Sequence, residues 1–260
     1  MRRSESIMKE KDIFREVHNP RHISRIYNYC DRWCERCAHT LRCTNFAIGQ
    51  KMDRDSKPHD KEMETLWPRL AAVKELAEAI LVKHADHPGV GLAEKRRFKT
   101  MKRSIEGHRL GAAAMRYMEF AHKFVRTHEN LAKQSAVLNA PAPWAGVSVA
   151  EAFDVIAWDH TIIAVKTGRA TKRHDVDEGF ADEPDFAAMD RDGTAKVALL
   201  SIDRSILAWA LLMTHLPAHT ESALAAMLTL HRLRTAMERE IPKARSFVRA
   251  GFDTVRFPAK

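Results

Sequence analysis

Glycine and proline are scarce in this chain, with ten of each among 260 residues. A fold built from many short strands and tight turns needs more of both, so an all-β sandwich or barrel is excluded, as is a low-complexity protein. Hydrophobic residues make up 45% of the chain and charged residues 30%, which excludes a disordered chain. Length and composition together predict a globular protein with a substantial core.

Long hydrophobic runs are also lacking. The charged residues 1–5 are not followed by an apolar stretch, so they do not resemble a secretory signal. The most apolar segment, 197–213, contains Asp203 and Arg204 and is too short to cross a bilayer. These features predict a cytoplasmic protein that does not contact a membrane.

Helical periodicity covers most of the chain, and no strand with alternating apolar and polar residues is visible. Asn19 and Pro20 are typical of a helix start, and they predict a helix that runs on to Cys30. Residues 44–60 are polar and are interpreted as a linker. Ser148 and Glu151 form the S-x-x-E pattern of a capping box, which predicts that a helix begins there.

The predicted fold class is therefore all-α, a helical bundle with an N-terminal four-cysteine metal-binding module. We expect residues 1–58 to hold this module and residues 59–260 to form the bundle, with an acidic loop without periodicity at 175–193. Asp192 is expected to cap the helix that follows this loop. The helix after Ser148 and the helix after residue 193 are apolar almost all round, which predicts that both are buried.

All four cysteines lie close together, in the run Cys30-x3-Cys34-x2-Cys37-x5-Cys43. In a reducing cytosol such a cluster is more typical of a metal site than of disulfides. The four cysteines are therefore the predicted metal ligands. Arginines are interleaved with them at positions 32, 36 and 42, and we expect this positive charge to lower the thiol pKa values.

The spacing of the cysteines bears on the identity of the metal. On a helix, Cys30, Cys34 and Cys37 would share one stripe and spread over about 10 Å of axial rise. Zinc needs all its sulfurs at about 2.3 Å from one ion and usually binds two separated C-x2-C pairs, which this chain lacks. A [4Fe–4S] cluster is wider, so it is the favoured cofactor, in a structural or electron-transfer role. Zn²⁺ is the alternative cofactor, and redox-active thiols without metal are the remaining interpretation.

The last three cysteines, in the spacing C-x2-C-x5-C, resemble the [4Fe–4S] loop of the DNA glycosylases related to endonuclease III. The run Pro88-Gly89-Val90-Gly91 also resembles the Pro-Gly-Val-Gly of the helix-hairpin-helix in that family. In the family the cysteine loop follows the hairpin, whereas here it precedes it, and Leu92 and Ala93 follow the hairpin where the family has its catalytic lysine. The local resemblance thus implies a cluster more than it implies a glycosylase, and no whole-chain family is recognised.

Ionisable residues on apolar helix faces indicate a second candidate site. Ferritin-like di-iron carboxylate proteins build their sites from one carboxylate or imidazole on each of four helices. The candidate residues here are Glu119, His122, Asp159, His160, Asp203 and His231. With metal bound, they would make the protein a di-iron-type oxidase. The alternative is that they are core polar groups paired with partners such as an arginine, so whether the chain is an enzyme stays open.

Positive charges outnumber negative charges by nine, and many of them follow Gly91 on a helix predicted over 95–109. The candidate nucleic-acid contacts there are Lys95, Arg96, Arg97, Lys99, Lys102 and Arg103. Such a face binds phosphates with an affinity that falls steeply with salt. A solvated helix face, or contact with acidic residues, explains the same charges. The predicted partners are therefore nucleic acid or an acidic protein.

Overall fold

The computed structural model describes residues 10–52, 70–71, 73–84, 108–133, 147–172 and 184–253. All regular structure in these ranges is helical, and they contain no strand, which confirms the all-α class. The chain divides into two compact units. The smaller unit is Met1–Thr65 with Val248–Lys260, and the larger unit is Leu66–Phe247. The sequence-based division at residue 58 had left the C-terminal residues out of the first part.

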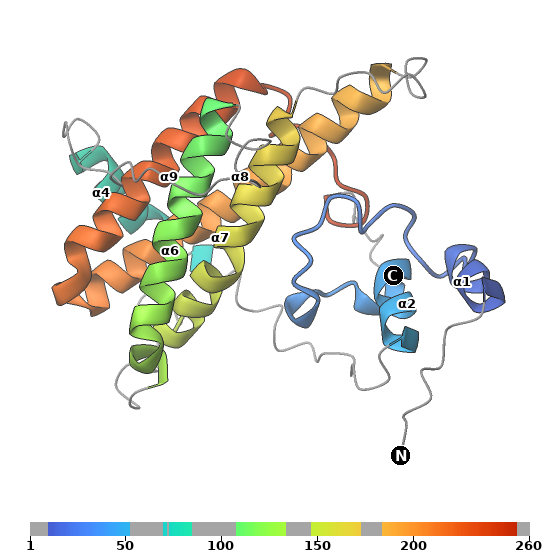
Figure 1. Ribbon diagram of the computed structural model, residues 1–260, viewed down its shortest axis with the longest axis horizontal. Coiled ribbons are helices and arrows are strands. Elements are labelled where there is room, and N and C mark those ends of the chain that lie inside the picture. The colour runs from blue at the N-terminus through green and yellow to red at the C-terminus, as the bar shows by residue number, and fades with distance from the viewer. Residues whose placement is uncertain are drawn as a thin grey trace, which may run out of the picture. The chain divides into compact units, whose positions relative to one another are not determined.

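The larger unit is built on four long helices. These are α6 (Arg109–Lys133), α7 (Val149–Thr171), α8 (Pro184–His215) and α9 (Thr220–Glu240). Helix α7 lies beside α6 and α8, and α9 lies beside α8 and α6, so the four helices close into a bundle (Figure 1). A shorter helix, α4 (Lys74–His84), contacts α8 and α9 and buries Ala77, Ile80 and Leu81.

Helices α7 and α8 supply much of the core, as their apolar sequences predict. Helix α7 begins at the predicted capping box, in which Ser148 Oγ accepts from the Glu151 N–H at 3.1 Å and the Glu151 carboxylate accepts from the Ser148 N–H at 2.8 Å. Trp209 of α8 is fully buried, and its indole N–H donates to the Tyr117 hydroxyl of α6 at 3.0 Å. The largest core side chain therefore keeps its polar group paired.

Helix α8 is longer than the sequence predicts. It begins at Pro184, so residues 184–193, predicted as the end of the acidic loop, are helical, and Asp192 lies inside the helix instead of capping it. The acidic residues here are compatible with a helix because Asp190 faces α7, where its carboxylate accepts from Arg169 at 2.7 Å. Residues 175–183 of the predicted loop lie outside the described residues.

One segment of α8 has the length and composition of a membrane-spanning helix. This segment is Ala187–His215, and 67% of its most apolar window is buried inside the larger unit. A buried core helix of a bundle has the same length and composition, because both environments select apolar side chains all round.

The smaller unit has short elements, α1 (Glu10–Val17) and α2 (Thr44–Met52), with the 3-10 turns η1 (Cys34–Arg36) and η2 (Thr40–Arg42) between them. Two predictions are wrong in this region. Residues 19–30 form turns instead of a helix, because Arg25 has a left-handed φ of 62° that a right-handed helix cannot contain. Residues 44–52 of the predicted linker form α2, whose Lys51 ammonium lies 2.6 Å from the Glu16 carboxylate of α1.

Candidate metal centre

The cysteines lie on turns, and each 3-10 turn ends at a cysteine. Cys34 begins η1 and Cys37 ends it, with the Cys37 N–H donating to the Cys34 carbonyl at 3.2 Å. Cys43 ends η2 in the same way, with its N–H donating to the Thr40 carbonyl at 3.3 Å. The single stripe that Cys30, Cys34 and Cys37 would share on an α-helix therefore does not occur, because turns separate these cysteines.

A strained backbone position separates Cys30 from Cys34. Arg32 has a φ of 61°, in the left-handed region that residues with a Cβ atom rarely adopt. Beside it, the Asp31 carboxylate accepts from the Trp33 N–H at 3.1 Å, which fixes a tight turn. Strain of this kind persists only where the surroundings hold it, and it is concentrated at functional sites.

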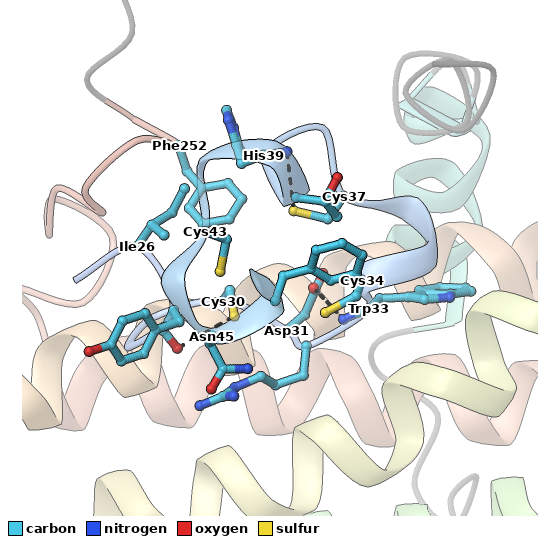
Figure 2. A pocket seen from close by; sticks show the side chains of 14 residues that line it. Ile26, Cys30, Asp31, Trp33, Cys34, Cys37, His39, Cys43, Asn45 and Phe252 are labelled. Carbon is cyan, nitrogen blue, oxygen red and sulfur yellow. Dashed lines mark hydrogen bonds between the residues drawn. The ribbon is translucent and has the colours of Figure 1, made fainter. Parts of the chain in front are cut away.

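All four cysteines line one pocket, which we call the cysteine pocket (Figure 2). Aromatic side chains complete its wall, among them Trp33, Phe46 and, from the C-terminal end of the chain, Phe252. The structure describes every cysteine of the chain, and it forms no disulfide between them. The turns thus bring together the four residues that the sequence predicts as ligands.

The four sulfurs are not arranged around a single point. Among the described residues, no group of three or more His, Cys, Asp or Glu side chains is placed to hold a metal ion. A zinc site needs its sulfurs at about 2.3 Å from one ion, so the thiols would have to move to bind zinc. A cluster of several iron atoms occupies the space between the sulfurs and requires a wider arrangement around a common pocket.

The thiols of Cys34 and Cys37 are hard to ionise in the metal-free chain. Burial, together with repulsion from neighbouring thiolates such as Cys30, raises both pKa values to about 11. The expected lowering by arginines is therefore wrong for these two thiols. Arg36 lies over the Trp33 ring, with its guanidinium carbon 4.8 Å from the ring centroid. A bound metal would have to displace these thiol protons, which couples metal binding to proton release.

Backbone groups already contact two of the sulfurs. The His39 N–H donates to Cys37 Sγ at 3.4 Å, and this contact favours the thiolate form. The Cys30 thiol donates to the Tyr27 carbonyl at 3.5 Å, a bond that a metal-bound thiolate would lose because it has no proton. The N–H contact at Cys37 is of the kind that tunes iron–sulfur centres.

The two aspartates of the second candidate site have arginine partners. Asp159 is fully buried and accepts two bonds from Arg204, at 3.1 Å and 2.7 Å. Asp203 accepts from Arg234 at 3.2 Å and from Arg245 at 2.5 Å. These ion pairs are what the alternative interpretation, satisfied core polar groups, predicts.

Among the described residues, no three members of that set are placed to hold a metal ion. The rings of His122 and His160 lie 5.6 Å apart, and His231 Nδ1 lies 3.2 Å from the Arg234 guanidinium. Burial lowers the pKa of His160 and of His231, so both imidazoles favour the neutral form. Glu119 is half-buried on α6.

The candidate nucleic-acid contacts Lys95, Arg96, Arg97, Lys99, Lys102 and Arg103 lie outside the described residues. The last residue of the predicted basic helix, Arg109, is described and begins α6. Its Nε donates to the Glu240 carboxylate at 2.8 Å, and His108 lies 3.2 Å from the same carboxylate. Arg109 thus joins the ends of α6 and α9.

Sequence reasoning missed the contribution of the C-terminal residues to the cysteine pocket. Phe252 lines the pocket, although it lies far along the chain from the cysteines. A weak signal was present in Gly251, since an isolated glycine near a bulky residue is typical of a turn or a close approach of two segments.

Comparison of the chain with protein-family models, with curated proteins and with solved structures finds no match.

Proposed function

We propose that the smaller unit binds one [4Fe–4S] cluster through Cys30, Cys34, Cys37 and Cys43, and that the cluster holds this unit in its folded form. The observation that carries the proposal is that all four cysteines line the cysteine pocket without forming a disulfide. Four thiols gathered in one place, in a cytoplasmic protein, are typical of metal ligands.

The spacing of the cysteines favours a cluster over a single zinc ion. The chain lacks the two separated C-x2-C pairs that are typical of zinc sites, and the four cysteines share one pocket. The local resemblance of C-x2-C-x5-C to a known cluster loop points in the same direction. Arg32, Arg36 and Arg42, along the same turns, would offset the negative charge of a thiolate-bound cluster.

The composition of the smaller unit supports a structural role. The buried hydrophobic side chains among its described residues are Ile26, Tyr29 and Trp33. A core of this size does not stabilise a domain without additional cross-links, and small domains often obtain them from metals. When bound, a [4Fe–4S] cluster also supplies one-electron chemistry. The half-buried cysteines would place such a cluster near the surface of the unit.

The experiment is purification of the full-length chain without oxygen, followed by an absorbance spectrum and by analysis of iron, acid-labile sulfide and zinc. We expect a brown protein with equal amounts of iron and sulfide. Leu41 is an exposed residue between the cysteines, and Leu41→Ser should leave this metal content unchanged. Cys37→Ser should abolish it. A colourless protein with zinc would contradict the iron–sulfur proposal, and a protein without metal would contradict any metal role.

A further inference from the structure

Residues 248–253 approach the cysteine pocket closely, and Gly251 shows how closely. It has a φ of +79°, and a Cβ atom built on it would lie 2.8 Å from Ile26 Cδ1 and 3.1 Å from Ile23 Cδ1. Only glycine combines this backbone conformation with so small a distance to a neighbouring segment. Residues 248–253 therefore pack against the turn that leads into Cys30.

Phe252 extends this contact to the pocket itself. Its ring meets the His39 ring edge-on, with 4.9 Å between the ring centroids, and it lines the pocket together with all four cysteines (Figure 2). His39 follows Cys37 by two residues, and its N–H is the donor to Cys37 Sγ. The Phe252 ring thus packs against the side chain of the residue whose N–H contacts a proposed ligand.

A local set of bonds holds Phe252 in this position. The Arg249 guanidinium carbon lies 4.8 Å from the centroid of the Phe252 ring, in a cation–π contact. Arg249 also donates to the Asp253 carboxylate from Nε at 3.2 Å and from a terminal nitrogen at 3.1 Å, and the Arg249 N–H donates to the same carboxylate at 2.8 Å. Arg249 does not line the pocket, so these bonds orient the ring from outside it.

We propose that residues 248–253 form a cover over the cysteine pocket, in which the Phe252 ring limits access of water, oxygen and chelators to the four sulfurs. This inference rests on the proposed function for its biological meaning, because the group protected would be the cluster. Protection of the thiols by residues 248–253 can be tested separately from the presence of the cluster.

The test measures the rate at which an aromatic disulfide modifies the thiols of the full-length protein, as purified, in the presence of a chelator. The reaction releases a coloured aromatic thiolate, which is followed by absorbance. We expect Phe252→Ala to raise the rate roughly tenfold, because the ring loses both its edge contact and its cation–π contact. Phe252→Tyr keeps the ring and should react at the wild-type rate. Leu41→Ser, at an exposed position outside the cover that does not line the pocket, is the matched control and should also react at that rate.

A second variant keeps the test decisive if Phe252→Ala does not fold. Arg249→Met removes the bonds that orient Phe252 without altering a pocket-lining residue, and we expect a severalfold faster reaction with an unchanged far-ultraviolet circular dichroism spectrum. Wild-type rates in both Phe252→Ala and Arg249→Met would overturn the cover. Metal analysis of the wild-type protein separates the two proposals: absence of metal contradicts the proposed function, whereas the modification rates still decide whether the cover protects the thiols.

Discussion

The two units of this chain differ in how many large apolar side chains they bury among the described residues. The larger unit has four long helices that bury large side chains such as Trp209, Leu211 and Met227. The smaller unit buries only Ile26, Tyr29 and Trp33 among its described hydrophobic residues, yet it holds all four cysteines and exposes Phe14, Val17 and Leu41. Each buried side chain contributes about 1.5–3 kcal/mol, so three of them do not offset the conformational entropy of a unit of this length. The comparison indicates that apolar packing specifies the larger unit, whereas in the proposed function ligation of a cluster would complete the smaller one.

Loss of a ligand should have the largest effect, and only on the smaller unit. We expect Cys37→Ser to abolish metal binding and to make residues 10–52 sensitive to protease, because the free energy of metal binding is also free energy of folding. Most of the helical circular dichroism signal should remain, since the long helices belong to the larger unit. Leu41→Ser serves as the control. Wild-type protease resistance of residues 10–52 in Cys37→Ser would show that the smaller unit folds without a centre.

Breaking a buried ion pair should have the next largest effect, and only on the larger unit. Asp159→Ala leaves Arg204 without its bidentate partner, and we expect a loss of about 3–5 kcal/mol in the free energy of unfolding. Urea denaturation followed by circular dichroism measures this loss. Val165→Thr, at an exposed position on the same helix, is the control and should change the free energy by less than about 0.5 kcal/mol. The account of this pair fails if Asp159→Ala is as stable as its control.

Two glycines of the smaller unit should respond in opposite directions to the same substitution. Gly251→Ala places a Cβ atom against Ile26 at a left-handed φ, and we expect a loss of about 1–2 kcal/mol in the stability of this unit. Gly49→Ala lies within α2, where no atom lies within 4 Å of the new Cβ, and should gain up to about 1 kcal/mol. Thermal unfolding of the metal-bound protein measures both. Equal effects of the two substitutions would contradict the close approach at Gly251.

Acid should lower the free energy of unfolding of the larger unit, by less than the substitutions above do. Burial lowers the pKa of His160 below its ordinary value of 6.5, so the unfolded chain binds this proton more readily than the folded one. Stability should therefore be constant above about pH 6.5 and fall below it, with a slope of at most about 1.4 kcal/mol per pH unit for one proton. Urea denaturation at pH 7.5 and pH 5.5 checks the direction. The His160→Gln variant should lose part of this slope, and an unchanged slope would remove His160 as its cause.

Patterns that repeat along the chain predicted the larger unit well. The capping box at Ser148 and Glu151 and the apolar residues of α7 were sufficient to place that helix, because each signal is local in sequence. The start of α8 was missed because Asp190 pairs with Arg169 of a neighbouring helix. A charge that is unfavourable in a buried helix by itself becomes acceptable once its partner is known, and the sequence does not identify that partner.

In the smaller unit, the sequence predicted that the cysteines lie together but not the backbone that brings them together. Clustering of the cysteines was enough to expect a shared site, and the structure brings all four to one pocket. The expected helix over residues 19–30 was wrong because Arg25 adopts a left-handed backbone conformation, which helix propensity does not predict for arginine. The contact of Phe252 with the pocket joins segments far apart in the sequence, and the isolated Gly251 is only a weak local signal for it.

Native mass spectrometry of the full-length protein, purified and sprayed without oxygen, tests the central claim most directly. The account predicts a mass above that of the polypeptide by one four-iron, four-sulfide cluster, and the loss of this added mass in Cys37→Ser. A mass equal to that of the bare polypeptide, or one raised by a single zinc ion, would contradict the account.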